Sequence, residues 1–333
     1  MKVVVICCAA FVNGAVFLAF AAQGPQPGAT TRVDPAFDAI VSPGTAMEIV
    51  KDGFGFINGI VWVKESGGGH LLVSDIPANV VYRWTPDGKM SSFLEKPDWT
   101  RTTGRPANPR FGANGIAIDS QGRIVYAAEA DRAIVRQEKD GKRTILAERY
   151  EGKRLNSPND LVFRSDGALY FTDPSGGNRF TGWDLRKELP YQGVFLLKDD
   201  KLRLVVADLE RPNGIVLSPD ERFLYVNDST RRTIVRYEVQ SDGSVANGTL
   251  FADMSVGTGT GNPDGMKFDA KGNLYSVGPG GIWVFSADGR HLGTIVPPEF
   301  APGFTFGDAD GKSLYLAASS KLTRIRVGNA GAR

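Results

Sequence analysis

The sequence predicts an all-β protein, and more specifically a six-bladed β-propeller with four-stranded blades. The first observation is a phrase that opens on Asn or Asp, is usually followed by Gly, and recurs five times at intervals of about 50 residues. The second is a degenerate sixth copy at residues 304–317. The third is the scarcity of continuous helical periodicity. Repeats of this length are typical of solenoids and propellers, and stacked sandwiches are the alternative all-β arrangement.

Each copy contains two short β-type runs joined by a turn. In the fourth copy the runs are "GIVLS" (214–218) and "FLYVND" (223–228), and "PDER" separates them. Turn residues between two apolar or aromatic runs are typical of a hairpin. A further β-branched run, "RTIVRYEV" (232–239), follows before the next copy. Four strands per repeat are the content of one propeller blade.

The polar residue that opens each copy comes just before the strand expected to line the propeller axis. In a closed ring, equivalent positions on successive blades converge at one mouth of the central channel, although they lie far apart in the sequence. The glycine that follows allows the backbone to turn sharply there. The residues expected to converge are Asn58, Asn114, Asn159, Asn213 and Asp264.

The first residues resemble a secretory signal. Residues 1–22 contain Lys2, an apolar run and a small-x-small pattern at Ala19–Ala21, and an uncleaved membrane anchor is the alternative. Residues 23–45, rich in Pro, Gly and Thr, are predicted to be a flexible linker, and residues 46–328 the propeller. We therefore expect an exported protein, periplasmic or secreted, with no membrane association after cleavage.

Composition excludes several classes of function. The net charge of +2 without a basic block gives no support for nucleic-acid binding. Both cysteines, Cys7 and Cys8, lie in the expected signal segment, so the mature chain is expected to lack thiol chemistry. The two histidines, His70 and His291, lie in turn-like sequences and are interpreted as solvated. A His-dependent triad or a multi-His metal site is thereby excluded.

The converging side chains offer only amide and carboxylate oxygens. Such donors suit a hard cation, Ca²⁺ before Mg²⁺ or another hard dication. The alternative is that Asn-Gly and Asp-Gly recur only because they form turns well. Their placement on one rim favours a metal site.

Several long motifs resemble the senescence-marker-protein, gluconolactonase and luciferin-regenerating-enzyme-like family. The resemblance covers nearly all of residues 46–327, and its motifs are "RLNSPNDLVF", "YFTDP", "RPNGIVLSPDERFLYV", "PDGMKFDAKGNLY" and "GPGGIWVFSADGRHLGTI". It implies a six-bladed propeller with one catalytic divalent cation, usually calcium, in the central channel. It also implies a metal-dependent hydrolase that acts on a small molecule, a sugar-type lactone or a related ester.

The resemblance also implies roles for individual residues. Asn159, Asn213 and Asp264 match the family's metal ligands, and Asp264 is also the candidate catalytic base. Asn114 matches a position that lines the substrate cavity. Asp173, in the family's "TDP" motif, is expected either to contact substrate or to fix a loop.

Three positions depart from the family pattern. Asn58 stands where the family has a ligating Glu, Glu129 where many members have a His, and Gly303 where the last blade often has an Asn. We hypothesise that Glu129 restores the missing negative charge in the substrate-binding cavity, either as a displaced ligand or as a second acid/base group. The alternative is a solvated Glu129 paired with Arg132 or Arg123.

Two functions therefore compete. The first is a lactonase with Asn58 completing a metal site of Asn159, Asn213 and Asp264. The second is a non-catalytic propeller that binds a ligand or partner through an altered site. The sequence does not identify the substrate or the oligomeric state.

Overall fold

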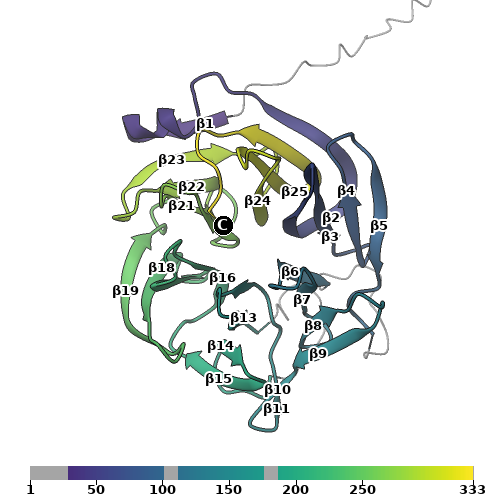
Figure 1. Cartoon of the computed structure of the whole chain (residues 1–333). Helices are drawn as coiled ribbons and strands as arrows, with labels where there is room; N and C mark the ends of the chain where they lie inside the picture. Colours follow the sequence, from purple (N-terminus) through teal and green to yellow (C-terminus); the bar gives the residue numbers. More distant parts are fainter. Residues whose placement is uncertain (1–28, 101–111, 176–186, 333) are drawn as a thin grey trace, which may run out of the picture.

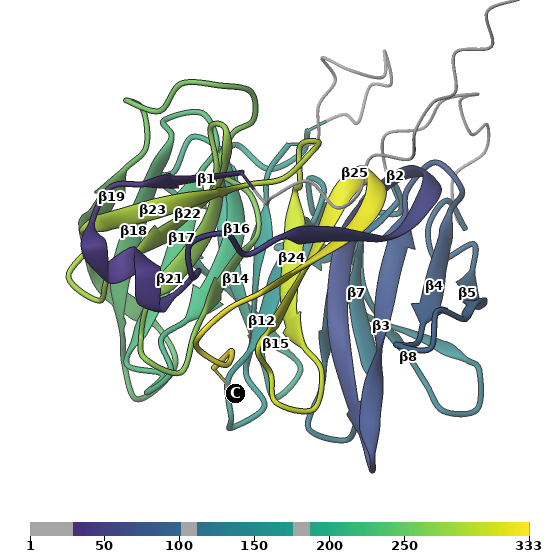
Figure 2. The same ribbon diagram turned by 90° about the horizontal axis from the view of Figure 1, so that it is seen from above.

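The computed structural model describes residues 29–100, 112–175 and 187–332 and has an all-β, propeller-like fold. The sheets follow one another around a ring (Figure 1), and their strands run between the two faces of that ring (Figure 2). Residues 1–22, with Cys7 and Cys8, lie outside the described residues, so the signal segment stays a prediction. In the described part of the chain, no helix combines the length and apolarity needed to cross a membrane.

Three of the sheets contain four consecutive antiparallel strands each. The first comprises β6 (Ala113–Ile118), β7 (Ile124–Ala128), β8 (Ala133–Gln137) and β9 (Arg143–Ala147). The second comprises β12 (Leu161–Phe163), β13 (Leu169–Asp173), β14 (Gly193–Lys198) and β15 (Lys201–Val206). The third comprises β16 (Pro212–Leu217), β17 (Phe223–Asp228), β18 (Thr233–Val239) and β19 (Val245–Asp253).

The other sheets are larger or smaller. A five-stranded sheet contains β20 (Met266–Phe268), β21 (Leu274–Gly278), β22 (Gly281–Phe285), β23 (His291–Val296) and β1 (Ala29–Arg32). A six-stranded sheet contains β24 (Gly303–Gly307), β25 (Ser313–Arg326), β2 (Met47–Glu65), β3 (Gly68–Asp75), β4 (Val80–Trp84) and β5 (Met90–Glu95). A separate hairpin pairs β10 (Arg149–Tyr150) with β11 (Lys153–Arg154).

The described strands thus pair into five sheets of four or more strands, whereas the sequence predicted six separate four-stranded blades. The cause is the continuity of β2 and β25. The first part of β2 pairs with β25, from Met47 opposite Ile325 onward, and its last part pairs with β3. A register irregularity between Asp52 and Ile57 separates the two parts. One long strand thus joins two groups of strands into one sheet.

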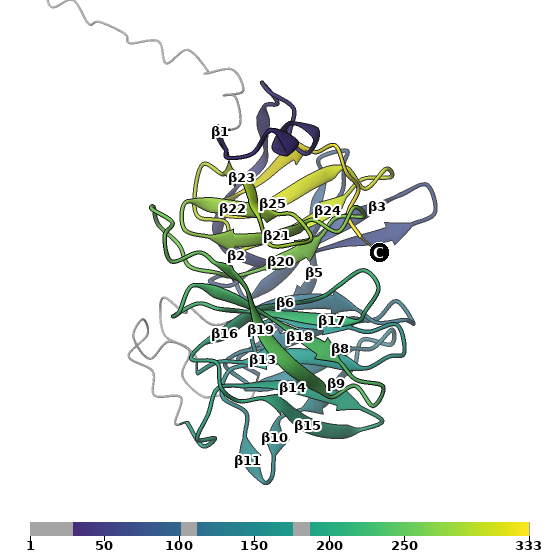
Figure 3. The ribbon, with the colours of Figure 1, turned by 90° about the vertical axis from the view of Figure 1, so that its left-hand side faces the viewer.

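Part of the expected linker is structured. β1 pairs antiparallel with the outer strand β23 (Figure 3), and a 3₁₀ helix, η1 (Pro35–Ala39), follows it. The side chain of Asp34 accepts a hydrogen bond from the amide of Ala36 at 2.8 Å and caps this helix. Phe37 is fully buried, and burial of such a side chain contributes about 1.5–3 kcal/mol. The Pro-rich composition of this stretch favoured a linker, so the burial of Phe37 was not predicted.

The two histidines are not in solvated turns, which corrects the sequence-based interpretation. His70 lies in β3 and is 5% exposed, and burial is the main cause that lowers its pKa. His291 lies in β23 and stacks on Trp283 with ring centroids 4.1 Å apart. Both rings serve packing, and neither lines the central cavity described below.

Close backbone contacts hold the repeat-opening residues in a ring. A Cβ atom on Gly59 would lie 1.8 Å from the carbonyl oxygen of Asn114, and one on Gly303 would lie 2.3 Å from that of Asn58. Both approaches require glycine, and the second joins the last segment to the first. The same relation links Gly115 to Asn159, Gly214 to Asp264 and Gly265 to Pro302.

Candidate functional site

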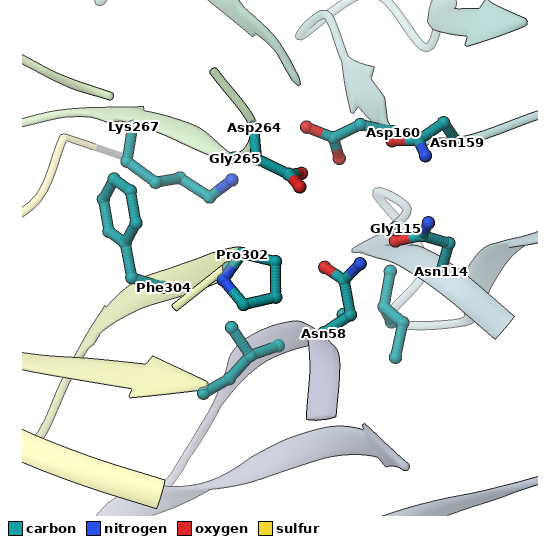
Figure 4. A pocket seen from close by; sticks show the side chains of 14 residues that line it. Asn58, Asn114, Gly115, Asn159, Asp160, Asp264, Gly265, Lys267, Pro302 and Phe304 are labelled. Atoms are coloured by element: carbon teal, nitrogen blue, oxygen red, sulfur yellow. The ribbon is translucent and has the colours of Figure 1, made fainter. Parts of the chain in front are cut away.

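A small cavity lies at the centre of the ring, where four of the repeat-opening residues converge (Figure 4). Its volume is about 30 Å³, enough for an ion or one or two waters. Its polar lining includes Asn58, Asn114, Asn159 and Asp264, as the repeat predicted. Gly303 also lines it but contributes no donor side chain.

Hydrogen bonds from neighbouring strands fix the backbone around this cavity. Asn227 of β17 accepts from the amide of Gly214 at 2.9 Å and donates to the carbonyl oxygen of Asp264 at 2.5 Å. Thr172 of β13 donates to the carbonyl oxygen of Asn213 at 2.6 Å. The backbone that carries the converging side chains is therefore held in place by these bonds.

Among the residues that the structure describes, two amide oxygens near the cavity have no hydrogen-bond partner. These are the buried Oδ1 atoms of Asn159 and Asn213. A buried acceptor left without a partner costs about 1–3 kcal/mol, so such atoms are rare in folded proteins. Asn213 does not line the cavity itself, but its side chain hydrogen-bonds to Asp264. Both oxygens are available to a cation held beside the Asp264 carboxylate.

Asp264 lies in a setting that disfavours a lone negative charge. Desolvation by burial raises its pKa well above the usual value, and the nearby Asp160 carboxylate raises it further. The hydrogen bond from Asn213 acts in the opposite direction. A bound cation would reverse this balance, because it favours the ionised carboxylate.

Glu129 reaches the same group of side chains. It is 6% exposed, and its Oε1 accepts from Asn159 Nδ2 at 3.4 Å. It also hydrogen-bonds to Asn114, while burial is the main cause that raises its pKa to about 8. Arg132 donates instead to the carbonyl oxygen of Leu155 at 2.5 Å.

The other arginine of that alternative is also engaged elsewhere. Arg123 lies 2.7 Å from Asp119 and 3.4 Å from Glu138. The interpretation of Glu129 as a solvated residue paired with either arginine is therefore wrong. Its carboxylate is buried at the rim of the amide cluster.

Asp173 fixes a loop rather than lining the cavity. It is fully buried, and its two oxygens accept from the amides of Asn156 at 2.7 Å and Ser157 at 2.8 Å. Both acceptors are thereby engaged, and the cavity lining does not include it. Of the two roles expected from sequence, the geometry favours loop fixation.

Replacing Asp173 with Asn is expected to flatten the pH dependence of folding stability. Burial raises the pKa of Asp173 to about 7, although the amides of Asn156 and Ser157 favour the ionised form. The folded-state pKa exceeds that of the unfolded chain, so the contribution of Asp173 falls as pH rises from about 4 toward 7. Urea unfolding of both proteins at several pH values measures this slope, and equal slopes would contradict the assignment.

Two residues that line the cavity were not predicted from the sequence. Asp160 occupies the position that holds glycine in the other copies, and it accepts from the amides of Leu161 at 2.9 Å and Ile215 at 3.2 Å. Lys267 stands where other copies have Val, Ala or Thr, and its ammonium lowers the pKa of Asp160, against the larger raising effect of burial. Both departures from the repeat were visible signals.

The donor set fits a hard cation. Asn58, Asn159 and Asp264 line the cavity, Asn213 hydrogen-bonds to Asp264, and oxygen donors of this kind suit Ca²⁺. No group of three or more His, Cys, Asp or Glu suited to a metal occurs within residues 29–100, 112–175 and 187–332. A cation here would therefore depend on neutral amides more than on charge.

The chain is similar in sequence and in structure to known gluconolactonases. A gluconolactonase of Zymomonas mobilis subsp. mobilis is 38% identical over 318 residues, which cover 92% of this chain and 88% of that protein. The structure of a gluconolactonase from Xanthomonas campestris has a TM-score of 0.77 at 30% identity and covers 92% of this chain and 99% of that chain.

A more distant structure, a calcium-binding regucalcin from Agrobacterium tumefaciens, has a TM-score of 0.66 at 18% identity. It covers 87% of this chain and 98% of that chain, and this likeness shows the fold alone. The family model described as "SMP-30/Gluconolactonase/LRE-like region" matches residues 56–320. The chain therefore belongs to the SMP-30/gluconolactonase/LRE-like family.

Proposed function

We propose that the chain is a lactone hydrolase of the gluconolactonase type that depends on a divalent cation in the central cavity. The similarity to a gluconolactonase over 92% of the chain supports the reaction class. The observation that supports a cation site is the pair of unpartnered oxygens on Asn159 and Asn213, near Asp264. Calcium is the preferred ion because the donors are all oxygens.

Asn159, Asn213 and Asp264 would hold the cation, with Asn58 contributing a fourth oxygen. When bound, a dication of this kind polarises a carbonyl group and so favours attack on it. Asn114 and the buried Glu129 would orient the lactone at the rim.

Hydrolysis adds water across the cyclic ester. The new bond joins the water oxygen to the carbonyl carbon, and the bond from that carbon to the ring oxygen breaks. Asp264 is the candidate base that accepts the proton from the water, since neither histidine lines the cavity. The ring oxygen leaves as a hydroxyl group after it receives that proton from Asp264.

A second candidate is a propeller that binds a ligand without catalysis. Asn58 and Gly303 favour it, because neither brings charge to the cavity. A site with fewer carboxylate ligands than the family pattern is expected to bind a cation more weakly.

We also infer that the six-stranded sheet represents two blades that share β2, which gives six blades in all. The register irregularity in β2 supports this division. The contact of Gly303 with Asn58 supports a ring of six inner segments.

Calcium added after EDTA treatment is expected to raise the melting temperature and to restore hydrolysis of gluconolactone. At a calcium concentration of 100 times Kd, the stabilisation is about 2.7 kcal/mol, a shift of a few degrees. The Asp264→Asn variant is the control and is expected to show neither response. Unchanged melting together with no hydrolysis would favour the second candidate.

A further inference from the structure

Three sheets carry the same clamp beside the cavity. The last residue of β3, β13 and β17 is an Asp whose carboxylate accepts from two consecutive amides of the segment that enters the inner strand. The three are Asp75 with Gly55 and Phe56, Asp173 with Asn156 and Ser157, and Asp228 with Glu210 and Arg211. Each clamp fixes the chain two and three residues before a repeat-opening asparagine.

In the sheet of β6 to β9 an alanine replaces this aspartate, and the carboxylate of Glu129 instead hydrogen-bonds to the backbone of Gly112 at the entry to β6. Ala113 pairs with Ala128, just as Ile57 pairs with Asp75, so Ala128 holds the clamp position. The next residue is Glu129, whose carboxylate contacts Asn159. Asp228 also accepts from the amides of Thr230 and Arg231 in the turn that follows it, and Ala128 offers no such acceptor to the turn after β7.

Asp98 supplies a clamp from a different segment. Its two carboxylate oxygens accept from the amides of Ala130 and Asp131, both at 2.9 Å. Asp98 is fully buried, and burying a carboxylate is costly unless its hydrogen bonds are well made. The two amides it holds directly follow Glu129.

The backbone of Asp98 is itself hydrogen-bonded to the side chain of Asn79. Its carbonyl oxygen accepts from Asn79 Nδ2 at 2.9 Å, and its amide donates to Asn79 Oδ1 at 3.2 Å. Thr100 donates through its hydroxyl to Asp131 at 2.5 Å and through its amide at 3.0 Å. The turn after β3 and the turn after β7 are thereby joined through residues 98–100.

We propose that Asp98 is a positioning residue that holds the turn after β7 so that Glu129 reaches Asn159 and Asn114 at the cavity. This inference deepens the proposed function and rests on it for the catalytic readout. A purely structural clamp would affect folding without acting through Glu129. A positioning role and a structural role therefore differ in whether the effects of changing Asp98 and Glu129 add.

The test is a double-mutant cycle between Asp98→Asn and Glu129→Gln. An asparagine accepts from one amide but places an NH₂ group against the other. Asp98→Asn is expected to lower kcat/KM for gluconolactone and calcium affinity by about ten- to a hundredfold, as is typical of residues that orient a site. In the Glu129→Gln background the same change is expected to have little effect.

Asp75→Asn is the matched control, because it weakens a contact of the same chemistry, one carboxylate with two consecutive amides, in the sheet of β3. Its effect is expected to add to that of Glu129→Gln. Additive effects of Asp98→Asn would overturn the proposal. If Asp98→Asn fails to fold, Asn79→Ser provides a second test. It removes the hydrogen bond to the carbonyl oxygen of Asp98 and is expected to show the same non-additivity.

Crystal structures of the wild type and Asp98→Asn provide a readout that does not depend on activity. The contact between Glu129 and Asn159 is expected to be lost in the variant. If it persists with Glu129 in place, the positioning role is wrong even if the protein is a lactonase. If it is lost in a protein that hydrolyses no lactone, the proposed function fails and the positioning role holds.

Discussion

Replacing Asp264 with Asn is expected to lower kcat for gluconolactone by about 10²–10⁴-fold, because the carboxylate is the candidate base. Calcium affinity is expected to fall as well, since Asp264 is the one carboxylate among the four proposed ligands. Steady-state kinetics and calorimetric titration measure the two effects. The exposed Asp253 provides the control, and Asp253→Asn is expected to change neither.

The same variant is expected to retain or gain stability without a cation. Burial raises the pKa of Asp264, so the folded state favours the protonated form and the ionised group opposes folding at neutral pH. The neutral side chain of Asp264→Asn removes the cost of burying that charge. Urea unfolding in EDTA at pH 7 measures the difference. A variant that loses stability in EDTA but keeps its kcat would contradict the assignment of Asp264 to the site.

Replacing Asn58 with Glu is expected to tighten calcium binding by at least about tenfold. Two unit charges 4 Å apart interact by about 4 kcal/mol at an effective dielectric constant of 20, and desolvation cancels part of this. Asn58 lines the cavity, so the added carboxylate would face the cation. Calorimetric titration of both proteins measures the change.

Gln121→Glu is the control for this experiment. It adds the same charge on an exposed turn that does not line the cavity. Its calcium affinity is expected to match that of the wild type. If Asn58→Glu and Gln121→Glu behave alike, then Asn58 does not face the cation.

The repeat predicted which residues converge, but not how the sheets divide. Equivalent positions in a closed ring must meet, so Asn58, Asn159 and Asp264 could be placed from spacing alone. The continuity of β2 could not be predicted, because pairing with β25 depends on contacts between the two ends of the chain. Turn residues mark local boundaries and carry no information on such distant pairing.

Residues that depart from the repeat were harder to predict. Asp160 and Lys267 differ from their counterparts in the other copies, and a search for similarity passes over such differences. Asp98 lies between two copies, so its contact with the turn after β7 follows only from the folded chain. Phe37 was hidden in a Pro-rich stretch whose composition favours a linker.

The most direct test is a crystal structure of the protein soaked with calcium. We expect one ion at the centre of the ring, bonded to Oδ1 of Asn159, Oδ1 of Asn213 and the carboxylate of Asp264 at about 2.3–2.6 Å. An ordered ion bound elsewhere, or these three side chains turned away from one another with no ion between them, would contradict a cation site built by the closed ring.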